Sequence, residues 1–322
     1  MKKIVLVIIS SVFAFSVFSQ DGLSKEEQDL LNKVNAENAA TAASAEAQEA
    51  YNTGITLFGQ RDYKKAISSF NTAIQGDPAF EAAYYNKGVA QIQAKLYKGA
   101  ISTFTKLIVL NDENANAYAQ RAIAYQKSND LKRALSDYEQ ATFFDTKNEK
   151  NFYNAGGVLF MQGDYDKAIK MLSRAIAIKP DFADAYNDRG SCYRMKKEFS
   201  KALEDYQKAG KYGPKHAFIF NNIGTVKKQL KDYQGAKDAY SKAISLDSKF
   251  YLAYNNRGAM NMEQRKANEA MLDFNKAIAL NKNYAPAYNN RGIIKHKKEK
   301  YKDAIADFTK AIAIDKNYAE AY

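Results

Sequence analysis

The sequence lacks tryptophan, and its 322 residues include only 1 Cys, 2 His, 4 Pro and 16 Gly. A single Cys excludes an internal disulfide, and one Cys with 2 His is too few for a structural zinc site, which ordinarily takes four ligands. So little Pro and Gly also excludes a collagen-like chain or a flexible linker. Hydrophobic residues nevertheless make up 46% and aromatic residues 13%, so we expect a folded protein with a regular interior.

The sequence also lacks the motifs of common catalytic chemistry, such as a glycine-rich phosphate loop, a zincin motif or a nucleophile elbow. We therefore expect no enzyme activity, no catalytic residue, no metal and no cofactor. The formal net charge of +12 favours an acidic partner. A nucleic acid is not the expected partner, because the sequence carries no nucleic-acid-binding motif.

The first 46 residues differ from the rest. Residues 1–19 have a positive start, an apolar stretch and Ser19 before the expected cleavage point, which is typical of a signal peptide. We therefore predict an exported protein, periplasmic or secreted, with no stable membrane insertion after cleavage. Residues 20–46 are rich in Ala and acidic, and we expect a helical leader that either packs on the next domain or stays solvated.

A repeat of 34 residues follows, and positions within each unit are counted from its first residue. Position twenty is Ala in every unit: Ala66, Ala100, Ala134, Ala168, Ala202, Ala236, Ala270 and Ala304. Position eight is Gly in seven units and Ala122 in the third, position four is aromatic in seven, and position twenty-four is Phe, Tyr or Leu. The eight units, without insertion or deletion, are 47–80, 81–114, 115–148, 149–182, 183–216, 217–250, 251–284 and 285–318.

This pattern resembles the tetratricopeptide repeat, over residues 47–318, in proteins of the exported bacterial kind. Tyr or Phe replaces the usual Trp, and the terminal Pro survives only at Pro78, Pro180 and Pro214. The resemblance implies an all-α fold, a right-handed α-solenoid of helix-turn-helix units. Gly at position eight and Ala at position twenty are expected where the two helices of a unit cross.

Four units carry Arg at position seven, and the same four carry Asp at position twenty-three. The pairs are Arg121 with Asp137, Arg189 with Asp205, Arg257 with Asp273, and Arg291 with Asp307. We predict an ion pair between the two helices of each such unit. A ligand-binding role for these Arg residues is the alternative.

Membership in the family would place the first helix of each unit along a concave groove. Positions five and six there are rich in Asn and Tyr, and side-chain amides can bind an extended peptide backbone. The candidate groove residues are Tyr85, Asn86, Tyr153, Asn154, Asn187, Asn221, Asn222, Asn255, Asn256, Asn289 and Asn290. The family's two-carboxylate clamp, with Lys at position five and Asn at position nine, is absent.

The sequence thus predicts a non-catalytic scaffold that binds a protein or peptide in this groove. The alternatives are an architectural subunit of an envelope or secretion complex, assembling through its termini and convex faces, and an accessory subunit that holds an enzyme's substrate. Residues 319–322 repeat the opening of a unit, so Ile305, Phe308 and Ile312 are expected to be partly exposed. Self-association through this end is therefore a further expectation.

Overall fold

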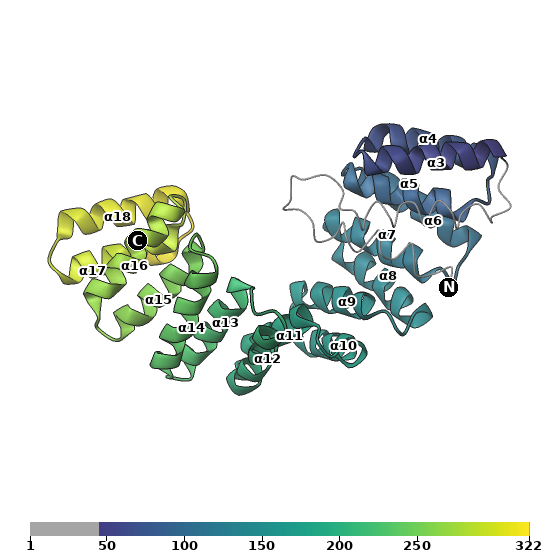
Figure 1. The fold of residues 1–322 in the computed structure, drawn as a ribbon. Helices are drawn as coiled ribbons and strands as arrows, with labels where there is room; N and C mark the ends of the chain where they lie inside the picture. The colour runs from purple at the N-terminus through teal and green to yellow at the C-terminus, as the bar shows by residue number, and fades with distance from the viewer. Residues whose placement is uncertain (1–44, 322) are drawn as a thin grey trace. The chain divides into compact units, whose positions relative to one another are not determined.

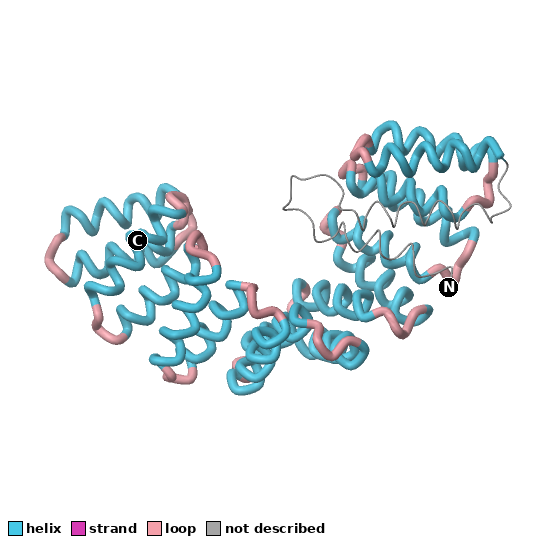
Figure 2. Tube along the Cα trace, in the orientation of Figure 1, coloured by secondary structure: helices cyan, strands magenta, loops and turns pink. Residues whose placement is uncertain are grey.

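The computed structural model describes residues 45–321, and every regular element in that range is a helix (Figures 1 and 2). The predicted signal peptide and all but the last two residues of the predicted leader lie outside this range. The first helices of the units are α3 (Ala45–Gly59), α5 (Glu81–Gln93), α7 (Ala115–Lys127), α9 (Glu149–Met161), α11 (Ala183–Met195), α13 (Ala217–Gln229), α15 (Tyr251–Glu263) and α17 (Ala285–Lys297). The second helices are α4 (Tyr63–Gly76), α6 (Tyr97–Leu110), α8 (Leu131–Phe144), α10 (Tyr165–Ile178), α12 (Phe199–Tyr212), α14 (Tyr233–Leu246), α16 (Ala267–Leu280) and α18 (Tyr301–Ile314), followed by the short 3₁₀ helix η1 (Ala319–Ala321).

The predicted all-α array of helical hairpins is confirmed. The chain forms two compact blocks, an N-terminal block up to Gln162 and a C-terminal block from Gly163. In each block, successive first helices contact one another: α3 with α5 and α5 with α7 in one block, α13 with α15 and α15 with α17 in the other. Second helices meet each other less closely, so the first helices lie on the inner side of each block.

Each first helix ends in the same way. The residue at position fifteen has a positive φ in all eight units, and seven of these residues are not Gly, for example Lys95 at 60°. In the second unit the Leu96 N–H bonds to the Gln91 carbonyl at 2.8 Å and the Lys95 N–H to the Ile92 carbonyl at 2.9 Å, which is a Schellman motif. Asp62, Asp130, Asp164 and Asp232 then cap the second helices that follow them.

The close crossing of the two helices of each unit explains why small residues stand at positions eight and twenty. The Ala at position twenty is 0–1% exposed in every unit. A Cβ added at Gly258 would lie 2.8 Å from the Cε1 atom of Phe274, the ring at position twenty-four of the same unit. Gly at position eight therefore makes room for this ring, which fills the space between the helices.

Among residues 45–321, no helix combines the length and the apolar composition that crossing a membrane requires.

Candidate functional site

The structure brings each Arg at position seven to the Asp at position twenty-three of its own unit. In the fifth unit, Arg189 Nε donates to Asp205 Oδ2 at 2.7 Å and Arg189 Nη2 to Asp205 Oδ1 at 2.8 Å. Arg121–Asp137, Arg257–Asp273 and Arg291–Asp307 form the same two-bond fork. The carboxylates are 4–8% exposed, so these pairs are shielded from water.

The same Arg residues also bind the preceding unit, which the sequence reasoning missed. Arg Nη1 donates to the side chain at position twenty-five of the unit before: Arg121 to Thr105, Arg189 to Ser173, Arg257 to Ser241, and Arg291 to Asn275, at 2.8–3.0 Å. The guanidinium groups also lie over the ring of the Tyr at position four, 5.5–5.8 Å from its centre. The sequence did contain a signal for this contact. The unit before each Arg-bearing unit has a short hydrogen-bonding side chain, Thr, Ser or Asn, at position twenty-five. Each of these Arg residues thus donates through Nε, Nη1 and Nη2 to side chains of its own and the preceding unit, and a structural role accounts for it.

The Asn residues at position five are buried in the interior of the array. Asn187, Asn221, Asn255 and Asn289 are 3–8% exposed, and Tyr85 is 4% exposed. The interpretation of these side chains as exposed groove contacts is therefore corrected. Asn187, Asn221 and Asn255 each lie beneath the first helix of the following unit, whereas Asn289 is buried within the last unit.

The Asn at position six of one unit donates a hydrogen bond to the Asn at position five of the unit before it. Asn222 Nδ2 donates to Asn187 Oδ1 at 2.9 Å, Asn256 Nδ2 to Asn221 Oδ1 at 3.0 Å, and Asn290 Nδ2 to Asn255 Oδ1 at 3.2 Å. We call these three bonds the amide rungs. The three donors are half-buried, and the oxygen of each donor amide makes no hydrogen bond within the described chain. Each rung therefore fixes an amide and leaves its oxygen available.

Asp188 sets the orientation of the first rung. Asn187 Nδ2 donates to Asp188 Oδ1 at 3.0 Å, and an ionised carboxylate can only accept. The Asn187 oxygen must then point to Asn222, which in turn must present its nitrogen to Asn187. The Asn222 oxygen is thereby left on the partly exposed side of α13.

In the N-terminal block the related contacts vary from unit to unit. Asn86, 6% exposed, donates from Nδ2 to the Tyr51 hydroxyl at 2.7 Å. Tyr153 and Asn154 on α9 are half-buried, and Ala119 stands at position five of the unit before, where it offers no acceptor. Of the candidate groove residues in this block, Tyr153 and Asn154 thus retain accessible surface.

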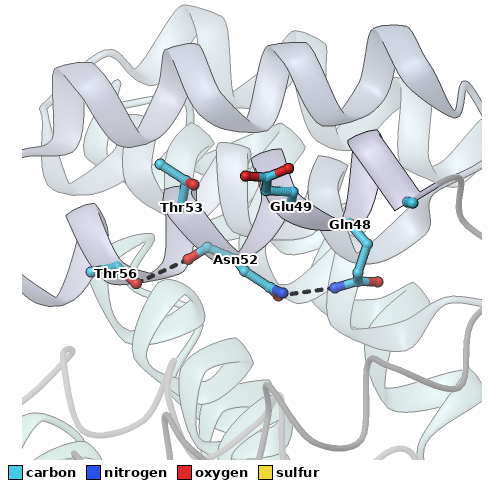
Figure 3. A pocket seen from close by; sticks show the side chains of 6 residues that line it. Gln48, Glu49, Asn52, Thr53 and Thr56 are labelled. Atoms are coloured by element: carbon cyan, nitrogen blue, oxygen red, sulfur yellow. Dashed lines mark hydrogen bonds between the residues drawn. The ribbon is translucent and has the colours of Figure 1, made fainter.

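A pocket of about 570 Å³ lies on α3 in the first unit (Figure 3). It is lined by Ala45, Gln48, Glu49, Asn52, Thr53 and Thr56. Gln48 Nε2 donates to Asn52 Oδ1 at 2.9 Å, and the Thr56 hydroxyl donates to the Asn52 carbonyl at 3.0 Å. Positions three and ten are buried in the seven later units, whereas here they are the exposed Glu49 and Thr56. This side of α3 is thus polar.

Several cations near the ends of the first helices have carboxylate partners. Lys196 Nζ contacts Asp166 at 2.6 Å and Glu198 at 3.0 Å, and these carboxylates raise its pKa. Lys227 pairs with Asp232 at 3.1 Å, and Lys228 with Glu263 at 2.8 Å. Cys192 is fully buried, and burial raises the pKa of its thiol to about 12, so the thiol stays protonated near neutral pH.

Comparison with solved structures shows the fold. A tetratricopeptide repeat protein from Parabacteroides merdae is 17% identical, with a TM-score of 0.59, over 81% of this chain and 100% of that one. The C-terminal part of a repeat-containing protein from Cytophaga hutchinsonii is 20% identical, with a TM-score of 0.58, over 74% of this chain and 97% of that one. One chain in the structure of the APC/C hetero-tetramer Cut9–Hcn1 is 16% identical, with a TM-score of 0.59, over 91% of this chain and 58% of that one. A comparison with curated proteins gives no match.

Family profiles identify the repeats. The profile described as a TPR repeat matches residues 156–196, and profiles described as the tetratricopeptide repeat match residues 51–117, 115–143, 183–216, 219–250 and 285–318. Together they take in most of the part of the chain that the structure describes. The chain therefore carries tetratricopeptide repeats, arranged as an array of helical hairpins.

Proposed function

We propose that the protein is a non-catalytic scaffold that binds an extended peptide segment along the first helices of its C-terminal block. The observation that carries this proposal is the set of amide rungs. Asn222, Asn256 and Asn290 come from three successive units, and each offers one uncommitted oxygen that its own rung holds in place. Backbone N–H groups of an extended peptide are suitable donors, and such contacts do not depend on the peptide's side chains.

Holding the amides in advance lowers the entropic cost of binding, because a fixed acceptor need not be ordered by the ligand. The C-terminal block is also the basic part of the chain, since residues 183–318 contain 27 Lys and Arg against 15 Asp and Glu. The proposed partner is therefore a peptide segment with acidic character, met after export of the protein.

The test is photocrosslinking in the exporting cell with a benzophenone amino acid at residue 252, which lies one turn before Asn256 on α15 and leaves the three rungs intact. The control places the same amino acid at residue 283, an exposed Asn in the loop before α17. A partner captured from residue 252 should be lost when Asn222 and Asn290 are changed to Ala, and retained when the exposed Asn71 and Asn283 are changed to Ala. Capture that survives the first pair of substitutions would refute the proposed site.

The exposed side chains on the second helices favour the architectural alternative. Val109 on α6 is 81% exposed and Phe143 on α8 is 73% exposed. If the protein assembles a complex through these outer surfaces, Val109→Ser with Phe143→Ser should prevent that complex from forming. The substitutions of Asn222 and Asn290 should then leave the complex unchanged.

A further inference from the structure

The second unit contains an incomplete version of the Arg–Asp pair. Lys87 stands at position seven and Thr103 at position twenty-three, whereas the other four units with a cation at position seven all have Asp at position twenty-three. Lys87 is half-buried on α5, yet its ammonium group forms no ion pair and no hydrogen bond with residues 45–321. The unit thus has the cation of the pair without the carboxylate.

A second cation lies near Lys87. Lys106 stands one helical turn after Thr103 on α6, so these two side chains share a helix face, and Lys106 is exposed. The pKa of Lys87 is lowered, chiefly because burial disfavours its charged form and also because Lys106 repels it. The described part of the chain supplies no carboxylate to either ammonium group. An anion beside Lys87 would offset both unfavourable effects.

The Gln91 side chain adds a third donor to this cluster. Gln91 stands at position eleven, one helical turn after Lys87 on α5, and is 9% exposed. The Thr103 hydroxyl donates to Gln91 Oε1 at 2.8 Å, while Gln91 Nε2 is not fully enclosed and forms no hydrogen bond within residues 45–321. A Cβ added at Gly99 would lie 2.9 Å from this nitrogen, so the glycine leaves space beside it. The cluster therefore offers N–H donors from three side chains, and its amide oxygen is already engaged.

The eighth unit shows what the equivalent place holds. There Asp307 at position twenty-three accepts two hydrogen bonds from Arg291 at position seven, at 2.6 and 2.8 Å. Asp307 also pairs with Lys295 at position eleven, at 2.8 Å. Positions seven and eleven of the second unit, Lys87 and Gln91, are likewise donors, but position twenty-three there carries no charge. The same two positions thus serve a carboxylate in one unit and lack one in the other.

We propose that Lys87, Gln91 and Lys106 bind a carboxylate from an acidic partner, an Asp or Glu side chain, at the place that Asp occupies in four other units. Lys106 is exposed and Lys87 is half-buried, so both ammonium groups can be reached from solvent. All three donors form charge-assisted hydrogen bonds with such a group. This site belongs to α5 and α6, whereas the amide rungs link α11, α13, α15 and α17, so either proposal can fail without the other.

The test follows acylation of Lys87 by the N-hydroxysuccinimide ester of acetic acid in the purified full chain, with mass spectrometry of its peptides as the readout. Lys237, an exposed lysine on α14, is the internal reference. Succinate, a small dicarboxylate, is added up to about 100 mM, a range that covers millimolar dissociation constants, and is compared with sodium chloride at equal ionic strength. We expect succinate to slow acylation of Lys87 relative to Lys237 about threefold or more, because a bound carboxylate favours the charged amine, which does not react.

Two variants test whether the incomplete pair is the site. Thr103→Asp supplies the carboxylate from within the unit, so it should slow acylation of Lys87 without succinate and remove the effect of succinate. Thr103→Asn has the same shape without the charge and should leave Lys87 reactive and sensitive to succinate. Circular dichroism should show unchanged helix content in both variants.

Two results would overturn the proposal. One is acylation of Lys87 that succinate slows no more than sodium chloride does. The other is protection by succinate that persists unchanged in Thr103→Asp.

Discussion

Each Arg at position seven joins three helices, the two of its own unit and the second helix of the preceding unit. Arg189→Met leaves the Asp205 carboxylate, 4% exposed, with no cation and also breaks the bond to Ser173 in the preceding unit. We expect a loss of about 3–5 kcal/mol in the free energy of unfolding, as for other broken buried pairs. The measurement is urea unfolding followed by circular dichroism.

Two variants sharpen that comparison. Arg189→Lys keeps the charge but cannot form the fork, so its stability should lie between those of the wild type and the Met variant. Lys237→Met removes an exposed cation and should change the free energy by at most about 0.5 kcal/mol. Equal effects of Arg189→Met and Lys237→Met would mean that the fork contributes nothing.

The lowered pKa of Asp307 predicts that the stability of the fold depends on pH. Burial acts to raise the pKa of this carboxyl, but hydrogen bonds from Arg291 and Lys295 outweigh burial and hold the pKa below its usual 3.8. The folded state therefore binds the proton less tightly than the unfolded state does. The resulting stabilisation is complete above the unfolded pKa of about 3.9 and is lost as the pH falls towards the folded pKa.

Urea midpoints measured between about pH 2.5 and about pH 6 would detect this loss. Asp307→Asn should be less stable near neutral pH and should show a shallower decline below about pH 4. A decline parallel to that of the wild type would show that other carboxyl groups account for all of it.

The internal repeat allowed the Arg–Asp pairs to be predicted, because one position varied with another among eight units of the same chain. The contact with position twenty-five also follows the repeat, but recognising it requires knowing that the second helix of the preceding unit lies beside position seven. Burial of Asn221 and Asn255 could not be predicted, since it depends on how closely the next first helix packs. At position six, one residue later in the chain, Asn is only half-buried.

The helices themselves followed closely from the spacing of Gly, Ala and aromatic residues. Gly258→Ala tests the crossing within a hairpin. The new Cβ would lie 2.8 Å from Phe274 Cε1 and 3.1 Å from Asp273 Cβ. We expect overpacking to cost about 1–3 kcal/mol, of which the higher helix propensity of Ala returns about 0.5–1 kcal/mol.

Gly157 on α9 is the matched control, because nothing lies within 4 Å of a Cβ added there. Gly157→Ala should raise the free energy of unfolding by about 0.5–1 kcal/mol. Thermal melts of the two variants should therefore shift in opposite directions. Shifts of the same sign would contradict the role of Gly258 in the crossing.

An array of repeats should tolerate the loss of one whole unit. Removing residues 251–284 joins Phe250 to Ala285 and places Arg291 beside Ser241 and Asn290 beside Asn221, the same pairing of residue types as before. Each unit contacts only its neighbours, so the shortened chain should fold, with an unfolding m-value lower by roughly one-eighth. A shortened chain that unfolds without cooperativity would contradict a stack of interchangeable units.

The distribution of charge predicts how partner binding responds to salt. Residues 183–318 have a net charge of +12 and residues 47–182 one of +3. If the partner is acidic, association should slow as NaCl rises from about 50 to about 300 mM, because the Debye length shortens. Association rates independent of salt would exclude electrostatic attraction as the source of partner preference.

The amide contacts show what the sequence could and could not predict about the array. The repeat alone places Asn at positions five and six of successive units. It does not reveal the rungs between them, or that the buried Asn289 oxygen has no hydrogen-bond partner in the described chain, because both depend on how neighbouring units lie in space. Sequence spacing thus locates the units, and the contacts between units require coordinates.

The polar residues Glu49, Thr53 and Thr56 on α3 restrict where evolution could add further hairpins to the array. A gene duplication that inserted a new hairpin ahead of the first unit would have to bury these polar groups against it. A duplication at any later junction would meet surfaces already suited to one another. Longer descendants of this protein should therefore have retained the polar opening helix and gained hairpins behind it.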